Sequence, residues 1–392
     1  MIINICLLTL LALLAIGSLL NLSSSPHWFI RGWDFPRLQI VGIGWALVVV
    51  FAAFQVLQSD PSVKGTVIAV SLAIFLTLWH GFRIYPYTRL VSPQAVGTPR
   101  SYLNSDVRDD QTVRIVFSNV EMENHDFDRW MTTMREVEPD VVVVLEADQA
   151  WIDGIRPFID QFKDHVLVPQ DNWYGMLMMS QLPMTSSAVH YLIQEDIPSI
   201  DAEIQLRDGT GIRLIAVHPR PPEPIRDNDS VARDAELILW AKELAEESSP
   251  VVIGGDLNDV AWSPTTRLFM RISGLLDPRR GRGLFNSFDA SRFYMRFPLD
   301  HVFHSTHFTV SDIRRLPDVG SDHFPIMIEL RYAPQQADEH DVLEKKVGDE
   351  EEAENRIERA EVSDEMQGDA VDGVGTEGTD AINSTTKADL HQ

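Results

Sequence analysis

VVIGGDLNDV occupies positions 251–260 and gives the first indication of the fold. The stretch begins like a strand buried on both faces, with three β-branched residues, and then becomes polar at Asp256, Asn258 and Asp259. One interpretation is a turn, because Gly, Asp and Asn supply the backbone angles and side-chain hydrogen bonds of turns. The other is a metal or phosphate site at the carboxyl end of a sheet. The rest of the sequence has to distinguish the two.

Similar short runs, rich in β-branched residues, recur over the middle of the chain. They are VRIVFSNV (113–120), VVVVLE (141–146), GMLMMS (175–180), DAEIQL (201–206), IRLIAVH (212–218), VVIGGD (251–256), LDHVFHS (299–305) and PIMIEL (325–330). Helical patterns at 126–139 and 231–248 lie between some of them. Strands that alternate with helices predict a layered α/β domain.

Several of these runs begin, end or are closely flanked by a residue that can bind a hard cation or carry a proton. They are Asn119, Glu146, His218, Asp256, Asn258, Asp300, Asp322 and His323. Each one alone has a simple structural explanation, such as a helix cap, a turn or a core histidine. Eight of them at strand ends are far harder to explain as coincidence. We therefore expect a functional site at one edge of the sheets.

Three apolar stretches open the chain, at 3–22, 38–57 and 66–82, and none contains a charged residue. The first two match the roughly 20 residues that span a bilayer, and the third is at the short end of that range. A cleaved signal peptide is the alternative for the first stretch. Its front end lacks Lys and Arg, and it has no clear cleavage site. The sequence predicts an integral membrane protein with three spans.

Charge is distributed unevenly along the chain. Of the net charge of -25, residues 1–100 hold +4, residues 101–333 hold -16 and residues 334–392 hold -13. The acidic middle argues against a broad cationic surface for nucleic acid. Five arginines flank the spans on the side of the membrane that would carry the domain, and one lysine, Lys64, lies on the other side. This excess of positive charge favours a cytoplasmic location for the domain. The single cysteine, Cys6, excludes an internal disulfide and a cysteine zinc site.

These observations predict four segments. Residues 1–82 form a membrane anchor, 83–110 a linker, 111–333 the catalytic domain and 334–392 an acidic disordered tail. Within that tail, a helix near 343–361 would be solvated.

The ordered motifs resemble the endonuclease/exonuclease/phosphatase superfamily, with the DNase I-like fold. The stretches that carry the resemblance are FSNVEMEN, VVVVLEAD, YGMLMMSQLP, AVHPRPP, VVIGGDLND, FPLDHVF and GSDHFPI. They extend over about residues 112–332, and the architecture is similar to bacterial membrane-anchored members. The resemblance implies a four-layer α-β-β-α sandwich and a bacterial inner-membrane location. It also implies a Mg²⁺-dependent phosphoester hydrolase, with Mn²⁺ as the alternative cation.

The resemblance assigns roles to positions of this chain. Glu146 would be the main Mg²⁺ ligand, and Asn119 and Asp322 would complete or flank the metal site. Asp256 would hold or activate the attacking water, while Asn258 would bind a phosphate oxygen.

The histidines complete this set of roles. His323 would pair with Asp300, which fixes the imidazole tautomer and stabilises its charged form. His218 would donate a proton to the leaving group or bind the phosphate. Which group is the acid and which the base stays open.

The chain departs from the usual motifs at two places. Leu145 precedes Glu146 where a glutamine is usual, and Ser287-Phe288 stands where relatives often carry Thr-Trp. The second departure concerns substrate contacts rather than catalysis.

Arginines in loops beside these motifs are candidates for binding substrate phosphate. They are Arg220, Arg226, Arg279, Arg280 and Arg282, and a solvated loop is the alternative explanation. Membrane anchoring favours a lipid-linked phosphate substrate. A membrane-tethered endonuclease or exonuclease on DNA or RNA, or a non-catalytic scaffold that retains the fold, are the competing hypotheses.

Overall fold

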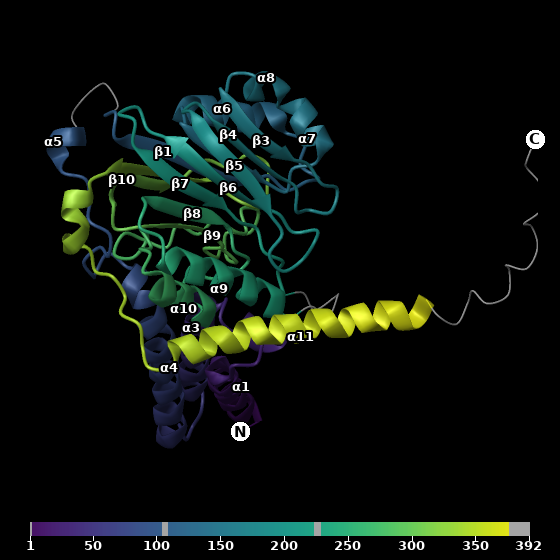
Figure 1. Cartoon of the computed structure of the whole chain (residues 1–392). Coiled ribbons are helices and arrows are strands. Elements are labelled where there is room, and N and C mark those ends of the chain that lie inside the picture. Colours follow the sequence, from purple (N-terminus) through teal and green to yellow (C-terminus); the bar gives the residue numbers. More distant parts are fainter. Residues whose placement is uncertain (1, 104–108, 223–228, 376–392) are drawn as a thin grey trace, which may run out of the picture.

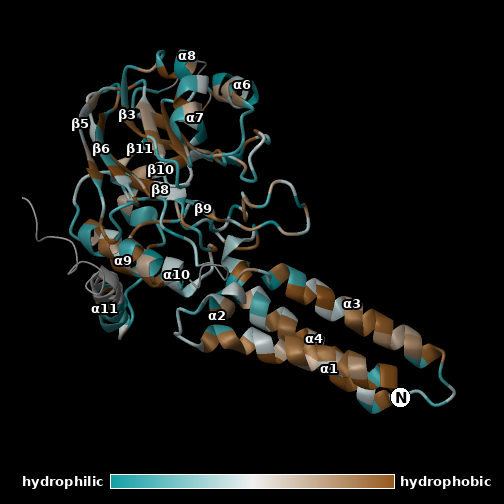
Figure 2. Cartoon of the chain, turned by 90° about the vertical axis from the view of Figure 1, so that its right-hand side faces the viewer, coloured by the Kyte–Doolittle hydropathy of each residue, from teal (hydrophilic) through white to brown (hydrophobic). Residues whose placement is uncertain are grey.

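The computed structural model describes residues 2–103, 109–222 and 229–375. Three long helices project from a domain in which two β-sheets are stacked between groups of helices (Figure 1). The long helices are apolar along most of their length (Figure 2). They are α1 (Ile2–Ser18), α3 (Arg37–Val56) and α4 (Val63–Ile84), with the short α2 (Trp28–Gly32) between the first two.

The prediction of three membrane-spanning stretches agrees with the helices of the structure. The segments Ile2–Leu22, Arg37–Val56 and Val63–Tyr87 are each long and apolar enough to cross a membrane. The helices pack on one another through buried small and aliphatic side chains, among them Leu11, Ala69 and Ala73. Most of their large apolar side chains face outward, as expected of helices surrounded by lipid.

The first sheet has six strands in the order β10-β11-β1-β2-β4-β3. Their bounds are β1 (Thr112–Asn119), β2 (Val141–Leu145), β3 (Asp164–Val168), β4 (Met176–Ser180), β10 (Phe308–Arg315) and β11 (Ile326–Tyr332). The second sheet has the order β5-β6-β7-β8-β9. Its strands are β5 (Met184–His190), β6 (Ser199–Gln205), β7 (Gly211–Ala216), β8 (Val251–Asp256) and β9 (Asp300–His304).

Helices cover the outer face of each sheet. The first sheet carries α6 (Phe127–Val137), α7 (Gln149–Gly154) and α8 (Arg156–Ile159), and the second carries α9 (Val231–Ala245) and α10 (Pro264–Ser273) (Figure 1). One apolar core lies between the sheets, and two further cores lie under the helices. The fold is therefore the predicted four-layer α-β-β-α sandwich.

Two glycines at the end of β8 allow neighbouring strands to approach closely. A Cβ at Gly255, whose φ is +146°, would lie 1.9 Å from the carbonyl oxygen of Val217. At Gly254 it would lie 2.7 Å from the carbonyl oxygen of His301 and from the Phe117 ring. Because β7 and β8 are parallel and β8 and β9 antiparallel, this close packing brings three strand ends to one edge.

The domain rests directly on the ends of the long helices. The Tyr87 hydroxyl donates a hydrogen bond of 2.5 Å to the carbonyl of Ala261, and the Trp262 indole donates one of 2.7 Å to the carbonyl of Asp34. Phe35 packs on Phe297 with ring centroids 5.7 Å apart. The membrane helices are thus joined to the loop that follows β8, only a few residues beyond Asp256.

The segment between α4 and β1 also packs against the domain. It contains the turn η2 (Tyr85–Tyr87) and the short α5 (Arg100–Leu103). Ala95 is completely buried, and the amide of Thr98 donates to the carbonyl of Val310 at 2.9 Å.

The last elements of the described chain are η3 (Pro334–Glu339) and α11 (Asp349–Gly375). We expected a solvated helix here, yet its first half lies along α9 and α10 and buries Ala353 and Ala360 (Figure 1). Arg271 forms a two-pronged ion pair with Asp349, with both contacts at 2.7 Å. The tail was predicted to be disordered over 334–392; the structure has η3 and α11 within this range, and residues 376–392 lie outside the described residues.

Candidate active site

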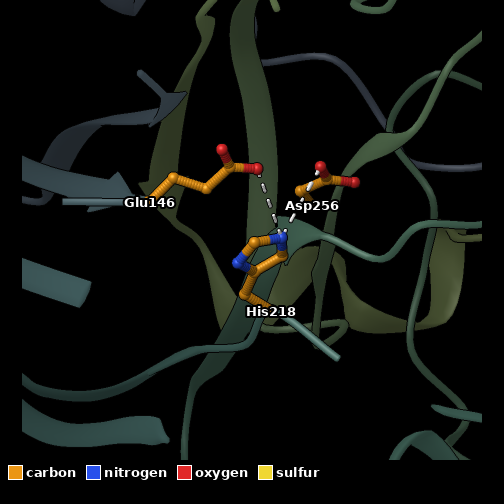
Figure 3. A group of neighbouring side chains, drawn as sticks. All are labelled: Glu146, His218 and Asp256. Carbon is orange, nitrogen blue, oxygen red and sulfur yellow. Dashed lines mark ion pairs between the residues drawn. The ribbon is translucent and has the colours of Figure 1, made fainter. Parts of the chain in front are cut away.

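Asn119 connects two carboxylates at the edge where the strands end. Its amide nitrogen lies 2.7 Å from Oε1 of Glu146 and 3.1 Å from Oδ2 of Asp256. Nε2 of His218 lies 3.9 Å from each of the same two side chains (Figure 3). Glu146, His218 and Asp256 therefore offer three ligand atoms that all lie within 4.8 Å of one another.

His323 lies between two further carboxylates. Its Nδ1 lies 2.8 Å from Oδ2 of Asp300, and its Nε2 lies 3.5 Å from Oδ2 of Asp256. The Phe288 ring packs against the imidazole in a tilted arrangement, with centroids 4.9 Å apart. His323 is 4 % exposed, so these neighbours determine its position and its charge.

Burial and charge shift the acidic groups in opposite directions. Burial raises the pKa of Glu146 to about 8, although the hydrogen bond from Asn119 opposes the shift. Burial would also raise the pKa of Asp256, but the neighbouring His323 and His218 outweigh it and hold that pKa below its usual value. Burial raises the pKa of Asp322 to about 6.

The pKa values of the two histidines are also shifted in opposite directions. Burial lowers the pKa of His218 below its usual value. Burial alone would do the same to His323, but Asp256 and Asp300 overcome this effect and raise its pKa to about 10. At neutral pH the site therefore holds one neutral and one charged imidazole.

Three residues of this edge have left-handed backbone angles that are uncommon outside glycine. The φ values are +62° for Glu146, +50° for Asn258 and +56° for Glu121. Such conformations are unfavourable and are often found where a side chain must point at a functional site.

Asn258 and Asp322 lie beside the cluster. The amide of Asn258 donates to Oδ1 of Asp256 at 2.9 Å, and its side chain donates to the carbonyl of Pro219 at 3.1 Å. The amide of Asp322 donates to Oε2 of Glu121 at 3.0 Å. All eight strand-end residues thus belong to one edge of the domain.

The third polar residue of the opening stretch has a different role. Oδ2 of Asp259 accepts a hydrogen bond of 2.5 Å from Ser263 and lies 3.5 Å from the guanidinium of Arg233. That guanidinium also donates to the carbonyl of Asn258 at 2.7 Å. Asp259 and Arg233 therefore stabilise the loop rather than face the cluster.

The sequence did not reveal several residues that position the cluster. The Ser321 hydroxyl donates to the carbonyl of Asn119 and accepts from the amide of His323, both at 2.9 Å. The Ser287 hydroxyl accepts from the amide of Asp300 at 3.1 Å. Only the adjacency of Ser321 to the Asp-His motif could have indicated this role.

The loop arginines lie in different surroundings. Arg220 pairs with Asp196 at 2.8 Å, and its guanidinium lies 5.4 Å from the ring of Tyr174. The Tyr174 ring in turn lies 5.3 Å from that of His218, so Arg220 is near the cluster.

The other loop arginines contact different parts of the chain. Arg282 donates to the carbonyls of Ala95 and Pro278, at 2.7 Å and 3.1 Å. Arg280 lies against Tyr87 at the membrane helices, and Arg279 is buried against Asp277. Arg226 lies outside the described residues.

The donor set fits a divalent cation. Glu146 and Asp256 present carboxylate oxygen atoms, the ligand type that Mg²⁺ and Mn²⁺ prefer, and the amide nitrogen of Asn119 holds both carboxylates in place. Burial raises the pKa of Glu146, and a bound cation would oppose this shift by stabilising the carboxylate. The neutral His218 could add a nitrogen ligand or remain free for substrate.

Comparisons with known proteins agree with this geometry. The model of the Endonuclease/Exonuclease/phosphatase family matches residues 116–323, a little more than half of the chain. A search of curated proteins found no match.

Several solved structures are similar in fold. TDP2 of D. rerio in complex with a single-strand DNA product is 16 % identical, with a TM-score of 0.48, and the match covers 56 % of this chain and 99 % of that one. The human Nocturnin catalytic domain with bound sulfate is 14 % identical, with a TM-score of 0.47, covering 58 % and 97 %. An endonuclease/exonuclease/phosphatase from Beutenbergia cavernae is 17 % identical, with a TM-score of 0.45, covering 57 % and 72 %.

Proposed function

The chain belongs to the endonuclease/exonuclease/phosphatase family, whose members are phosphoester hydrolases, and we propose that it hydrolyses a lipid-linked phosphate at a membrane surface. Metal-dependent attack by water is the proposed chemistry. The side chains of Glu146, Asn119 and Asp322 are proposed to hold the cation directly or to support its ligands.

An apolar loop beside the cluster is the observation that supports a lipid-linked substrate. Phe293, Tyr294 and Met295 are 81 %, 59 % and 42 % exposed, which is unusual for three consecutive apolar residues. The side chain of Gln39, in the first turn of the membrane helix α3, donates to the carbonyl of Tyr294 at 3.0 Å. The loop thus lies at the level where α3 leaves the bilayer.

The same loop is joined to the catalytic edge. The amide of Ala290 donates to the carbonyl of Asp322 at 2.7 Å, and the Phe288 ring packs against that of His323. The surface proposed to contact lipid is therefore continuous with the residues proposed to act on the phosphate. This arrangement supports a substrate that is presented from the membrane.

Each side chain has a proposed task in the hydrolysis. Asp256 orients the attacking water and accepts its proton as the oxygen–phosphorus bond forms. The charged His323, held by Asp300, stabilises the negative charge that develops on the phosphoryl oxygens. The amide group of Asn258 and the guanidinium of Arg220 bind phosphate oxygens.

The breaking bond releases an alkoxide or phosphate that must be neutralised. Nε2 of His218 lies 3.9 Å from Glu146 and from Asp256, and as a neutral imidazole this side chain can donate a hydrogen bond from its one N–H to the leaving oxygen, which takes its proton from water. A bound divalent cation would lower the charge on the phosphate and on the leaving oxygen.

The experiment that tests this function uses the full chain in mixed micelles. Substrates are a polyprenyl pyrophosphate, a phospholipid, a short water-soluble phosphodiester and single-stranded DNA, each with Mg²⁺, Mn²⁺ or EDTA. We expect metal-dependent turnover of a lipid-linked substrate that Asp256→Asn abolishes and that the exposed control Asp160→Asn retains.

Two results would contradict the proposal. Faster turnover of DNA than of either lipid would favour a membrane-tethered nuclease. No metal-dependent turnover by a folded protein that binds Mn²⁺ would favour a scaffold.

A further inference from the structure

A pocket lies where α4 meets the domain, and its lining residues have no role in the proposed hydrolysis. We call it the basic pocket. Its volume is about 550 Å³, within the range that holds small ligands. The end of α4, helix α10 and the segment 341–346 form its walls, and Figure 1 shows this segment beside the upper end of α4 on its way to α11. Six cationic side chains and two carboxylates line it.

Four of the six cations form no ion pair within the described part of the chain; three of them are arginines and the fourth is Lys346. Arg271 is paired with Asp349, and Lys345 with Glu350. Arg83, Arg267 and Arg280, by contrast, form no ion pair with any residue that the structure describes. These three are the unpaired arginines.

The contacts of the unpaired arginines do not neutralise them. Arg83 and Arg280 lie over aromatic rings, at 5.6 Å from Phe82 and 5.7 Å from Tyr87. Nε of Arg267 donates to the carbonyl of Ser263 at 3.1 Å. Burial lowers the pKa of Arg267 to about 10, and the nearby positive charges of Arg83 and Arg271 lower it further. Grouped cations of this kind are stabilised by an anion.

The pocket continues into an apolar groove along α4. The groove has a volume of about 740 Å³ and shares Phe82, Arg83 and Tyr85 with the basic pocket. Leu78 and Phe82, which line it, are 68 % and 73 % exposed on a helix that can cross a membrane. At Gly81 a Cβ would meet no atom within 4 Å, so the groove is open there.

We propose that the basic pocket binds the phosphate headgroup of an anionic phospholipid, whose acyl chain lies in the groove along α4. Arg83 is in the last turn of α4, where the headgroups of the leaflet facing the domain begin. The phosphate contacts the unpaired arginines, two of which belong to the domain. The lipid therefore connects the membrane helices to the domain, at a site lined by other residues than the hydrolytic cluster.

The test measures lipid-dependent stability of the full chain in a neutral detergent after removal of bound lipid. Phosphatidylglycerol, phosphatidylcholine with the same acyl chains, and inorganic phosphate are added in separate arms. Native mass spectrometry counts the lipids retained. At a large excess over its dissociation constant, phosphatidylglycerol should raise the melting temperature by about 5 °C. Phosphatidylcholine and inorganic phosphate at equal concentration should have little effect.

Two variants test the contacts of the lipid headgroup and of the acyl chain separately. Arg83→Gln should abolish the rise caused by phosphatidylglycerol, and Gly81→Leu should reduce it by filling the groove. The matched control is Arg89→Gln, because Arg89 is an exposed arginine just beyond the same helix end that does not line the pocket. If Arg83→Gln does not fold, Arg280→Gln takes its place.

The proposal is wrong if phosphatidylcholine stabilises as well as phosphatidylglycerol, or if Arg89→Gln loses the effect as fully as Arg83→Gln. An equal effect of inorganic phosphate would also overturn it, in favour of a site for a free anion. Since no arm measures hydrolysis, the result does not depend on the proposed function.

Discussion

Nδ1 of His323 lies 2.8 Å from Oδ2 of Asp300, and both side chains are almost completely buried. Replacing Asp300 with asparagine keeps the shape of the pair and removes its charge. We expect Asp300→Asn to lower kcat by about 10²- to 10⁴-fold, because the charged imidazole loses one of its two counter-charges.

The pH profile provides a separate readout of this pair. The pKa of His323 is raised to about 10, so activity that needs the charged imidazole should persist until the pH rises towards that value. In Asp300→Asn the pKa falls, and activity should be lost at a lower pH than in the wild type. An unchanged alkaline limb would show that His323 does not act as a cation.

Metal affinity should depend strongly on pH because of Glu146. Burial raises the pKa of its carboxyl to about 8, so below that pH a proton must be displaced before the cation binds. We expect the apparent affinity for Mn²⁺ to rise by about tenfold per pH unit between pH 6 and 8. Titration followed by electron paramagnetic resonance measures it. Glu146→Gln should remove the dependence together with most of the affinity, whereas the exposed control Glu136→Gln should change neither.

Glu236 provides a stability test away from the site. It is buried on α9, accepts a hydrogen bond of 3.0 Å from Ser199, and burial raises its pKa to about 7. The folded protein therefore binds a proton that the unfolded chain releases near pH 4.5, so stability should fall as the pH rises from about 4.5 to 7. Glu236→Gln should remove this loss, which reaches on the order of 3 kcal/mol. Melting temperatures against pH would test this, with the exposed Glu246→Gln as the control.

The exposed loop at Phe293 predicts that a substitution there lowers kcat/KM for membrane substrates but not for soluble ones. Phe293→Ser removes a large, 81 % exposed apolar side chain from the surface proposed to face the bilayer. We expect kcat/KM to fall by about tenfold for a lipid-linked substrate in vesicles, since partial burial of such a side chain is worth about 1–2 kcal/mol. Hydrolysis of a short water-soluble phosphodiester should be unchanged. An equal loss on both substrates would mean that the loop supports the catalytic edge instead.

The sequence predicted a layered α/β domain because eight of the strands and the helices α6 and α9 have clear local patterns, whereas the four-layer order came from the family resemblance. The strands β3, β5 and β10 were not predicted. The sequence also indicated the eight residues at the strand ends, since a polar residue beside an apolar run is visible without knowledge of distant contacts. The partners of Asp259 and Arg280 were not predictable in this way. Asp259 meets Arg233 from α9, and Arg280 meets Tyr87 from the end of α4, and both contacts depend on how separate elements pack.

The packing of α11 was missed for a related reason. Its acidic composition is typical of a solvated helix, but two buried alanines, the ion pair of Asp349 with Arg271 and the contacts of Arg356 hold it against α9 and α10. Arg356 reaches Thr265 and lies 3.2 Å from Asp234 on α9, which the sequence of the tail alone does not reveal.

The hydrogen bonds from Tyr87 to Ala261 and from Trp262 to Asp34 hold the catalytic edge at one height and one orientation above the bilayer. On a long flexible tether, the active site could reach substrates in solution at many distances from the membrane. A domain fixed on its membrane helices can reach only substrates at the membrane surface. Its rate in vesicles should therefore follow the mole fraction of substrate in the lipid. Diluting the substrate with inert lipid should slow it even when the bulk concentration is constant.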